Sequence, residues 1–168
     1  MANSSIKRLS MAVLLACAIA KTQSAPALDV GDRAPNFSVK TDKGKLISPS
    51  APGGKLLVLN FWETACAPCV AELPSLTAFA RRFRSSQVVV LAISGDEDAG
   101  KYRRFLRDRK IALETYRDPT RQIGRSFGTV MFPETYIIQD GRIVRKVVGS
   151  IDWMTDDIAS FVRRLLTP

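Results

Sequence analysis

The feature that most restricts the fold of this chain is a Cys-x-x-Cys pair at the junction of a buried strand and a helix. Residues 56–62, Leu-Leu-Val-Leu-Asn-Phe-Trp, form an almost continuous apolar run, which is typical of a central strand covered on both faces. Beyond Cys66, apolar residues recur every three or four positions, which predicts a helix. These positions are Val70, Leu73, Leu76, Ala80 and Phe83. Cys66 and Cys69 therefore lie where the strand passes into the helix.

This placement favours redox chemistry. At a helix N-terminus, unpaired backbone N–H groups and the positive end of the helix dipole stabilise a thiolate, so Cys66 is the expected nucleophile. Two intervening residues bring both sulfur atoms within disulfide reach, so Cys69 can resolve a mixed disulfide formed by Cys66. Pro68 suits the first helical turn, where a backbone N–H has no partner.

The composition weakens the competing chemistries. The chain contains no histidine, which excludes Ser-His-Asp and Cys-His nucleophiles and His-ligated metal sites. A zinc site built on Cys66 and Cys69 would need a second ligand pair, which the sequence lacks. A purely structural disulfide is less favoured, because a static cross-link stabilises mainly by closing a longer loop.

The remaining pattern alternates strands with helices. Strands are expected at 37–39, 46–47, 88–93, 111–116, 135–139 and 143–148. Helices are expected at 99–109 and 120–127, and Pro74 is expected to kink the helix that follows Cys66. A last helix, capped by Asp152, is expected to bury Met154, Ile158, Phe161, Val162 and Leu165. This order predicts an α/β fold whose central mixed sheet has a parallel centre and an antiparallel edge, with an N-terminal β-hairpin.

The first 27 residues have the pattern of a secretory signal. Lys7 and Arg8 precede a short apolar run at 11–20, and small residues follow, so cleavage is expected after Ser24 or Ala27. Lipid anchoring at Cys17 is the alternative. The predicted boundaries are therefore a signal segment at 1–27 and one domain at 28–168. Export places the chain in an oxidising compartment on the extracytoplasmic, or periplasmic, side of a bacterial membrane.

Residues 60–69, Asn-Phe-Trp-Glu-Thr-Ala-Cys-Ala-Pro-Cys, resemble the active-site segment of the thioredoxin superfamily, and more narrowly that of the exported TlpA/ResA-type thiol–disulfide oxidoreductases. The opening at 31–37, Pro74 and the stretch at 128–135 carry the same resemblance. It implies a thioredoxin-like three-layer α/β/α fold without a cofactor. It also implies that Pro133 is preceded by a cis bond and faces the redox disulfide of Cys66 and Cys69.

The implied activity is the reduction of protein disulfides, with electrons from a membrane-bound donor. Haem-attachment cysteines in cytochrome c maturation are the leading substrate class, and copper-site cysteines come next. The expected docking residues are Trp62, Pro68, Phe132 and Pro133. Trp62 is interpreted as partly a core aromatic and partly a shaping element of the docking surface. The protein is expected to be a monomer that binds no nucleic acid.

Three positions depart from the family pattern. Ala65 replaces an aromatic residue, Met131 replaces a glycine, and Asn60 replaces the buried aspartate of thioredoxin proper. An amide cannot take up a proton, but Glu72 matches an acidic position thought to do so in the TlpA/ResA-type helix. Three residues after Cys69 on a helix, Glu72 shares its face. The alternative for Glu72 is an ordinary exposed carboxylate.

Other interpretations stay open. A peroxiredoxin would need Thr or Ser three residues before its cysteine, where this chain has Glu63. A copper chaperone would use Cys66, Cys69 and Met131, but no metal site is predicted.

Lys and Arg number 25 against 16 Asp and Glu. A basic cluster is interpreted as a solvated face or a docking patch for an acidic partner. It comprises Arg81, Arg82, Arg84, Lys101, Arg103, Arg104, Arg107, Arg109 and Lys110.

Overall fold

The structure, a computed structural model, describes residues 27–50 and 52–167. Its strands are β1 (Val39–Lys40), β2 (Leu46–Ile47), β3 (Leu56–Trp62), β4 (Val88–Ser94), β5 (Glu114–Arg117), β6 (Glu134–Gln139) and β7 (Arg142–Val148). Its helices are α1 (Ala67–Arg82), the 3₁₀ turn η1 (Arg84–Ser86), α2 (Ala99–Asp108), α3 (Gln122–Ser126) and α4 (Asp156–Leu166). The predicted signal segment and Cys17 lie outside the described residues, apart from Ala27.

The central sheet has the strand order β5-β4-β3-β6-β7. β3 pairs in parallel with β4, and β4 with β5, whereas β6 is antiparallel to both β3 and β7. Every residue of β3 and β4 is buried, as their continuous apolar sequences require. β1 and β2 form a separate two-stranded antiparallel sheet. The predicted mixed sheet and N-terminal hairpin are confirmed.

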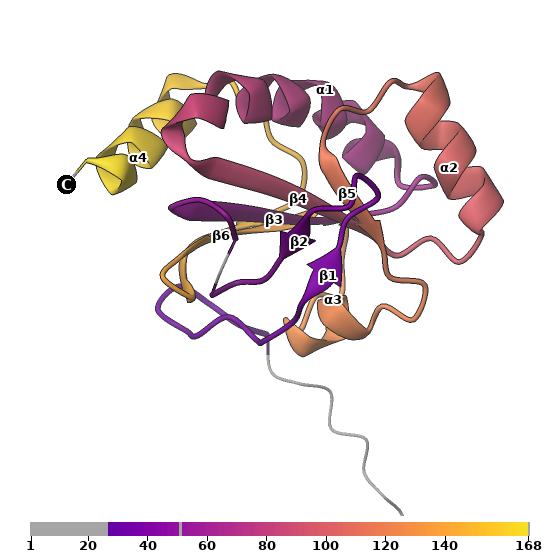
Figure 1. The fold of residues 1–168 in the computed structure, drawn as a ribbon, viewed down its shortest axis with the longest axis horizontal. Coiled ribbons are helices and arrows are strands. Elements are labelled where there is room, and N and C mark those ends of the chain that lie inside the picture. Colours follow the sequence, from indigo (N-terminus) through magenta and orange to yellow (C-terminus); the bar gives the residue numbers. More distant parts are fainter. Residues whose placement is uncertain (1–26, 51, 168) are drawn as a thin grey trace, which may run out of the picture.

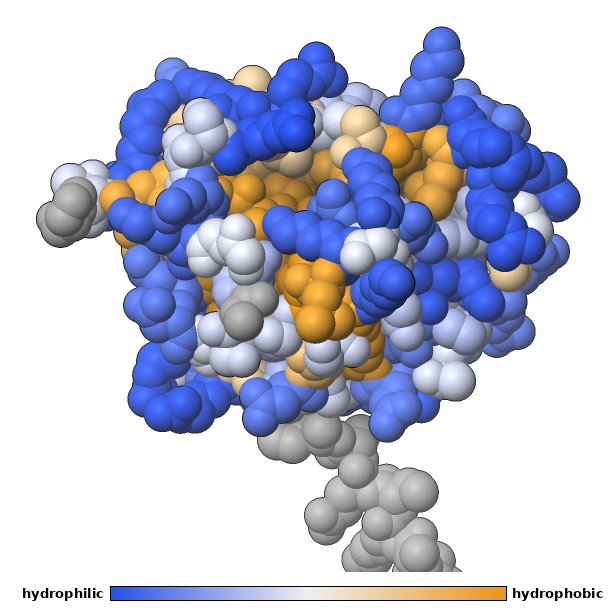
Figure 2. All heavy atoms as spheres, viewed as in Figure 1, coloured by the Kyte–Doolittle hydropathy of each residue, from blue (hydrophilic) through white to orange (hydrophobic). Residues whose placement is uncertain are grey.

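The sheet is the middle of three layers (Figure 1). Helices α1, α2 and α4 pack on one face, against the side chains of Leu56 and Val58 in β3. The N-terminal segment and α3 cover the other face, against Leu57 and Leu59, so the pleat of β3 alternates between two hydrophobic cores. Each fully buried leucine contributes about 1.5–3 kcal/mol. Over α2, the face drawn in Figure 2 is mainly hydrophilic.

The last helix differs from the prediction. The Asp152 carboxylate accepts a hydrogen bond from the Met154 N–H at 2.9 Å, so it closes a local turn instead of capping the helix. α4 begins at Asp156, and Met154 is 38% exposed, not buried. Ile158 and Val162 are buried as predicted. Within residues 27–50 and 52–167, no helix has the length and apolar character needed to cross a membrane.

Candidate active site

Cys66 and Cys69 are joined by a disulfide at the start of α1, with their Cα atoms 5.2 Å apart. Cys66 is the N-cap residue of α1, and its Sγ accepts a hydrogen bond from the Cys69 N–H at 3.3 Å. Pro68 lies in the first turn, which contains no acidic side chain. The pair thus sits at the positive end of a helix with no nearby carboxylate on that turn to oppose a thiolate.

The two sulfur-bearing residues differ in accessibility. Cys66 is half-buried, and its neighbours Ala65, Ala67 and Pro68 are exposed. Cys69 is 1% exposed and belongs to the core under α1. A disulfide partner approaching from solvent therefore reaches Cys66 before Cys69.

Glu72 lies one turn beyond Cys69 and is only 3% exposed, so the alternative of an exposed carboxylate is wrong. Its Oε1 accepts a hydrogen bond from the Asn60 amide at 2.9 Å, and its Oε2 accepts one from the Ile151 N–H at 3.0 Å. The Asn60 amide also donates to the Thr135 hydroxyl at 2.9 Å. The carboxyl is therefore held by β3, by β6 through Asn60, and by the segment before α4.

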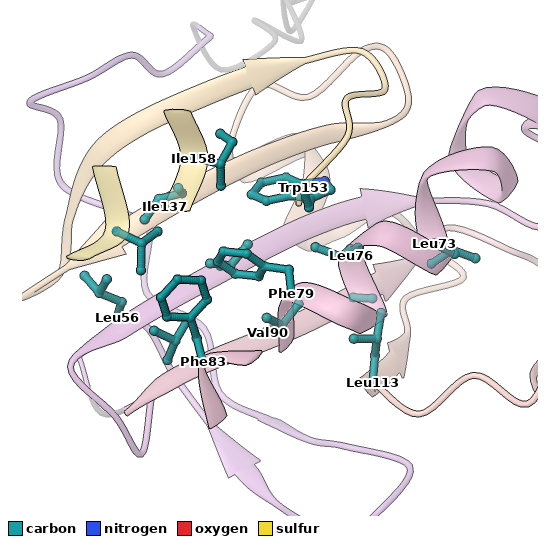
Figure 3. Packing of buried hydrophobic residues seen from close by; sticks show 14 of the residues in the cluster. Leu56, Leu73, Leu76, Phe79, Phe83, Val90, Leu113, Ile137, Trp153 and Ile158 are labelled. Carbon is teal, nitrogen blue, oxygen red and sulfur yellow. The ribbon is translucent and has the colours of Figure 1, made fainter. Parts of the chain in front are cut away.

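Burial raises the pKa of Glu72, and the hydrogen bond from Ile151 only partly opposes this. The segment that buries Glu72 is fixed over α1 by Trp153, which is fully buried. The Trp153 ring packs on Phe79 with centroids 5.5 Å apart, as Figure 3 illustrates. The backbone N–H of Trp153 donates to the Ser75 hydroxyl at 3.3 Å. A buried carboxyl with a raised pKa keeps its proton to a higher pH than an exposed one, which suits a group that exchanges protons with a thiol.

The loop between β3 and α1 is held by residues far along the chain. Asp96 accepts hydrogen bonds from the Thr64 hydroxyl at 2.6 Å and from the Thr64 N–H at 3.0 Å. The Glu63 carboxylate pairs with the Arg121 guanidinium at 2.6 Å. Burial raises the pKa of Glu63, and Arg121 opposes the shift. Sequence reasoning missed Asp96 and Arg121, because no local pattern links positions so far apart.

The stretch before β6 lies at the same sheet edge as the redox pair. Glu134, the first residue of β6, pairs with Phe61 near the carboxyl end of β3, and Cys66 follows that end. The Phe132–Pro133 peptide bond is cis, as the resemblance implied. Pro133 is buried and Phe132 half-buried.

Trp62 is fully buried, which confirms the core part of its predicted mixed role, whereas a direct contact of its side chain with a docked substrate is wrong. Its ring packs against Tyr102 and Phe105 of α2, with centroids 6.3 Å and 5.5 Å away. Trp62 is the last residue of a strand buried on both faces, so its side chain enters the core. Its side chain lies in the same hydrophobic core as Cys69.

A protein-family model described as the AhpC/TSA family matches residues 30–147. The chain belongs to the AhpC/TSA family. It is also 27% identical to the thiol-disulfide oxidoreductase ResA of Bacillus subtilis, over 96% of this chain and 92% of that protein.

Two solved structures show the same fold as this AhpC/TSA member. The thioredoxin domain of a thiol-disulfide oxidoreductase from Bacteroides vulgatus matches with a TM-score of 0.70 at 22% identity, covering 84% of this chain and 100% of that one. A thiol:disulfide interchange protein of the thioredoxin family from Chlorobium tepidum matches with a TM-score of 0.67 at 23% identity, covering 85% and 100%. The predicted thioredoxin-like fold is confirmed.

The AhpC/TSA chain therefore combines a thioredoxin-like fold with a disulfide at the N-terminus of α1. Together with its ResA relatives, this makes it a thiol–disulfide oxidoreductase. Such enzymes act on disulfide-bearing proteins. Among the described residues, no group of three or more Cys, His, Asp or Glu side chains is arranged to hold a metal ion.

Proposed function

We propose that this protein is an extracytoplasmic reductase of protein disulfides, in which Cys66 attacks the substrate and Cys69 resolves the mixed disulfide. The observation that carries the proposal is the unequal exposure of the two cysteines. Cys66 is half-buried at the helix N-terminus, whereas Cys69 is 1% exposed. The accessible residue has the helix dipole and the Cys69 N–H to stabilise a thiolate, as a nucleophile needs.

The reaction is a two-electron exchange. The Cys66 thiolate attacks one sulfur of the substrate disulfide, forming a mixed disulfide, and the other substrate sulfur leaves as a thiolate and takes up a proton. Cys69 then loses its proton, and its thiolate attacks the Cys66 sulfur. A Cys66–Cys69 disulfide forms and the second substrate thiolate leaves. The substrate is reduced, the enzyme is oxidised, and a dithiol donor must return two electrons to restart the cycle.

Glu72 is the proposed acceptor of the Cys69 proton. Both residues are buried on α1, three positions apart, which places them on the same helix face. The pKa of Glu72 is raised by burial, so the carboxyl can take up a proton and later return it. The Asn60 side-chain amide now donates to Glu72 Oε1. A rotated amide would offer its oxygen instead, as an acceptor for the proton of a protonated Glu72.

The proposed docking surface surrounds Cys66. Pro68 is exposed beside it, and the cis Phe132–Pro133 bond lies at the same sheet edge. Val130 and Met131, just before this bond, are 88% and 59% exposed, which supplies apolar area for a substrate segment. An extended segment could pair with the backbone here, as in β-strand addition.

The location and substrates follow from the sequence. The charged and apolar pattern of residues 1–27 supports export, with cleavage or with lipidation at Cys17. The proposed substrates are haem-attachment cysteines in cytochrome c maturation, or copper-site cysteines, and the proposed donor is membrane-bound. We propose a monomer.

A peroxidase role is disfavoured, because Glu63 stands where peroxiredoxins need Thr or Ser and is paired with Arg121.

The reduction potential of the Cys66–Cys69 pair tests the proposed direction. Equilibration with glutathione redox buffers, followed by thiol alkylation and mass spectrometry, measures it. A reductase should have a potential near that of thioredoxin, about −270 mV. A potential near that of the strong periplasmic oxidants, about −120 mV, would contradict the reductase direction.

A further inference from the structure

The loop before Cys66 is tied to the N-terminus of α3 by an ion pair between residues that lie far apart in the sequence, Glu63 and Arg121. The Glu63 carboxylate lies 2.6 Å from the Arg121 guanidinium, with side chains 18% and 48% exposed. The Glu63 carbonyl also accepts the Cys66 N–H at 3.2 Å, so Glu63 is bonded directly to the backbone of the proposed nucleophile. A displacement of Glu63 would therefore move the backbone of Cys66 as well.

Arg121 is held in place by its own backbone. It is the N-cap residue of α3 and has a left-handed conformation, with φ of 53°, that non-glycine residues seldom adopt. Its N–H donates to the Asp118 carbonyl at 2.9 Å, and the buried Asp118 carboxylate accepts the Ile123 N–H at 2.8 Å. α3 thus presents the guanidinium from a fixed position.

The same guanidinium reaches the stretch before β6. It lies 5.9 Å from the centre of the Phe132 ring, within the range of a cation–π contact. Phe132 precedes Pro133 and follows the exposed Val130 and Met131. Arg121 therefore contacts both segments of the proposed docking surface, one through Glu63 and the other through Phe132.

The structure leaves space for this arrangement at Gly95. A Cβ atom at Gly95 would lie 2.6 Å from Glu63 Oε1 and 3.1 Å from Arg121 Nε, closer than Cβ atoms normally approach. The backbone of Gly95 is itself fixed, since its N–H donates to the Trp62 carbonyl at 3.0 Å. Only glycine at this position lets the ion pair lie against the sheet.

We propose that Arg121, through Glu63 and Phe132, is a positioning residue that sets the Cys66 loop and the Phe132–Pro133 stretch at the spacing needed to dock a polypeptide disulfide. The inference rests on the proposed function and names what controls access at its site. A small disulfide such as oxidised glutathione reaches Cys66 without spanning both segments. The Glu63–Arg121 pair should therefore matter most for polypeptides.

The test compares kcat and KM for insulin disulfide reduction by the wild type, Glu63→Gln, Arg121→Gln and the double variant. Loss of a partly exposed ion pair should raise KM about two- to fivefold, with a smaller change in kcat. The double variant should be no worse than the more affected single variant, because the residues act as a unit. Arg121→Lys, which keeps the charge, should restore part of the loss.

Arg145→Gln is the matched control. It breaks a 2.9 Å ion pair with Asp157 that joins β7 to α4 and does not involve the docking surface. Its KM should match the wild type. Glu63→Gln and Arg121→Gln should also react with oxidised glutathione closer to the wild-type rate than with insulin.

A KM equal to that of Arg145→Gln, or equal losses with insulin and oxidised glutathione, would overturn the positioning role while leaving the reductase proposal intact. A wild-type protein that does not reduce insulin would instead overturn the proposed function, and this inference with it.

Discussion

Two glutamates, Glu63 and Glu72, flank the redox pair, and they differ in burial and in the groups that hold their carboxylates. Glu72, on the core side, is 3% exposed and is held by neutral donors, Asn60 and the Ile151 N–H. Glu63, on the loop side, is partly exposed and paired with Arg121. Burial raises the pKa of both, but only Glu63 has a cation to oppose it. A carboxyl without a cation suits proton transfer, whereas one with a cation suits holding a loop in place.

Asn60→Asp should have the largest effect, because it places a second carboxyl beside Glu72. The new carboxyl would replace an amide 2.9 Å from Glu72 Oε1, so two buried carboxylates would share one site and one would keep a proton. When burial raises the pKa of a carboxyl in the folded state, the folded protein loses stability as the pH rises above the ordinary pKa of that group, which is 4.5 for Glu.

The free energy of unfolding of Asn60→Asp should therefore fall by about 3 kcal/mol at pH 8, and by less at pH 4. Urea denaturation at both pH values measures this. Asn60→Ser, which removes the amide without adding a charge, is the control. An equal loss of unfolding free energy at the two pH values would show that negative charge beside Glu72 is not the cause of the destabilisation.

The Glu72→Gln variant tests whether the glutamate on the core side carries protons. It should slow disulfide exchange at least about tenfold at neutral pH, since it removes the proposed acceptor of the Cys69 proton. The variant should also lose less stability than the wild type as the pH rises above 4.5, the ordinary Glu value, because no buried carboxyl remains there to ionise.

Stopped-flow kinetics from pH 5 to 9 tests the rate, with Glu114→Gln as control. Glu114 is a half-buried carboxylate on the edge strand β5 that accepts the Thr41 hydroxyl at 2.6 Å. An unchanged pH–rate profile in Glu72→Gln would remove the proton-carrier role.

The Gly95→Ala variant tests the ion pair on the loop side, and its effect should be smaller. Its Cβ would displace the Glu63 and Arg121 side chains, but both end in flexible groups that can move toward solvent. We expect a loss of about 1 kcal/mol in the free energy of unfolding, together with a raised KM for insulin. Denaturant titration and steady-state kinetics measure both. A loss of several kcal/mol would mean that the loop side is as rigid as the core side.

The sequence was sufficient for features that depend on local pattern. The run at 56–62 predicts β3 with its observed bounds, and the placement of Cys66 at the start of a helix is confirmed. β6 and β7 are expected as neighbouring strands, and Asp140 and Gly141 between them both have positive φ, which a tight Asp-Gly hairpin turn requires. These features need only the residues within one strand, turn or helix.

Features that depend on packing between distant parts of the chain could not be predicted from the sequence. Glu72 shares a face with Cys69 by helix geometry, but its burial depends on Ile151 and Trp153, far along the chain. The Glu63–Arg121 pair requires α3 to return to the β3–α1 loop. Asp152 was misread because Asp favours turns as strongly as helix caps, and only the tertiary structure decides between them.

The trapping of mixed disulfides tests the central claim most directly, namely that Cys66 attacks and Cys69 resolves. Reduced Cys69→Ser and Cys66→Ser variants would each be incubated with insulin, and covalent adducts would be quantified by mass spectrometry after acid quenching. Cys69→Ser should accumulate a stable adduct through Cys66, because no thiol remains to release it. Cys66→Ser should accumulate little, because Cys69 is 1% exposed. Equal trapping by the two variants would contradict the assignment.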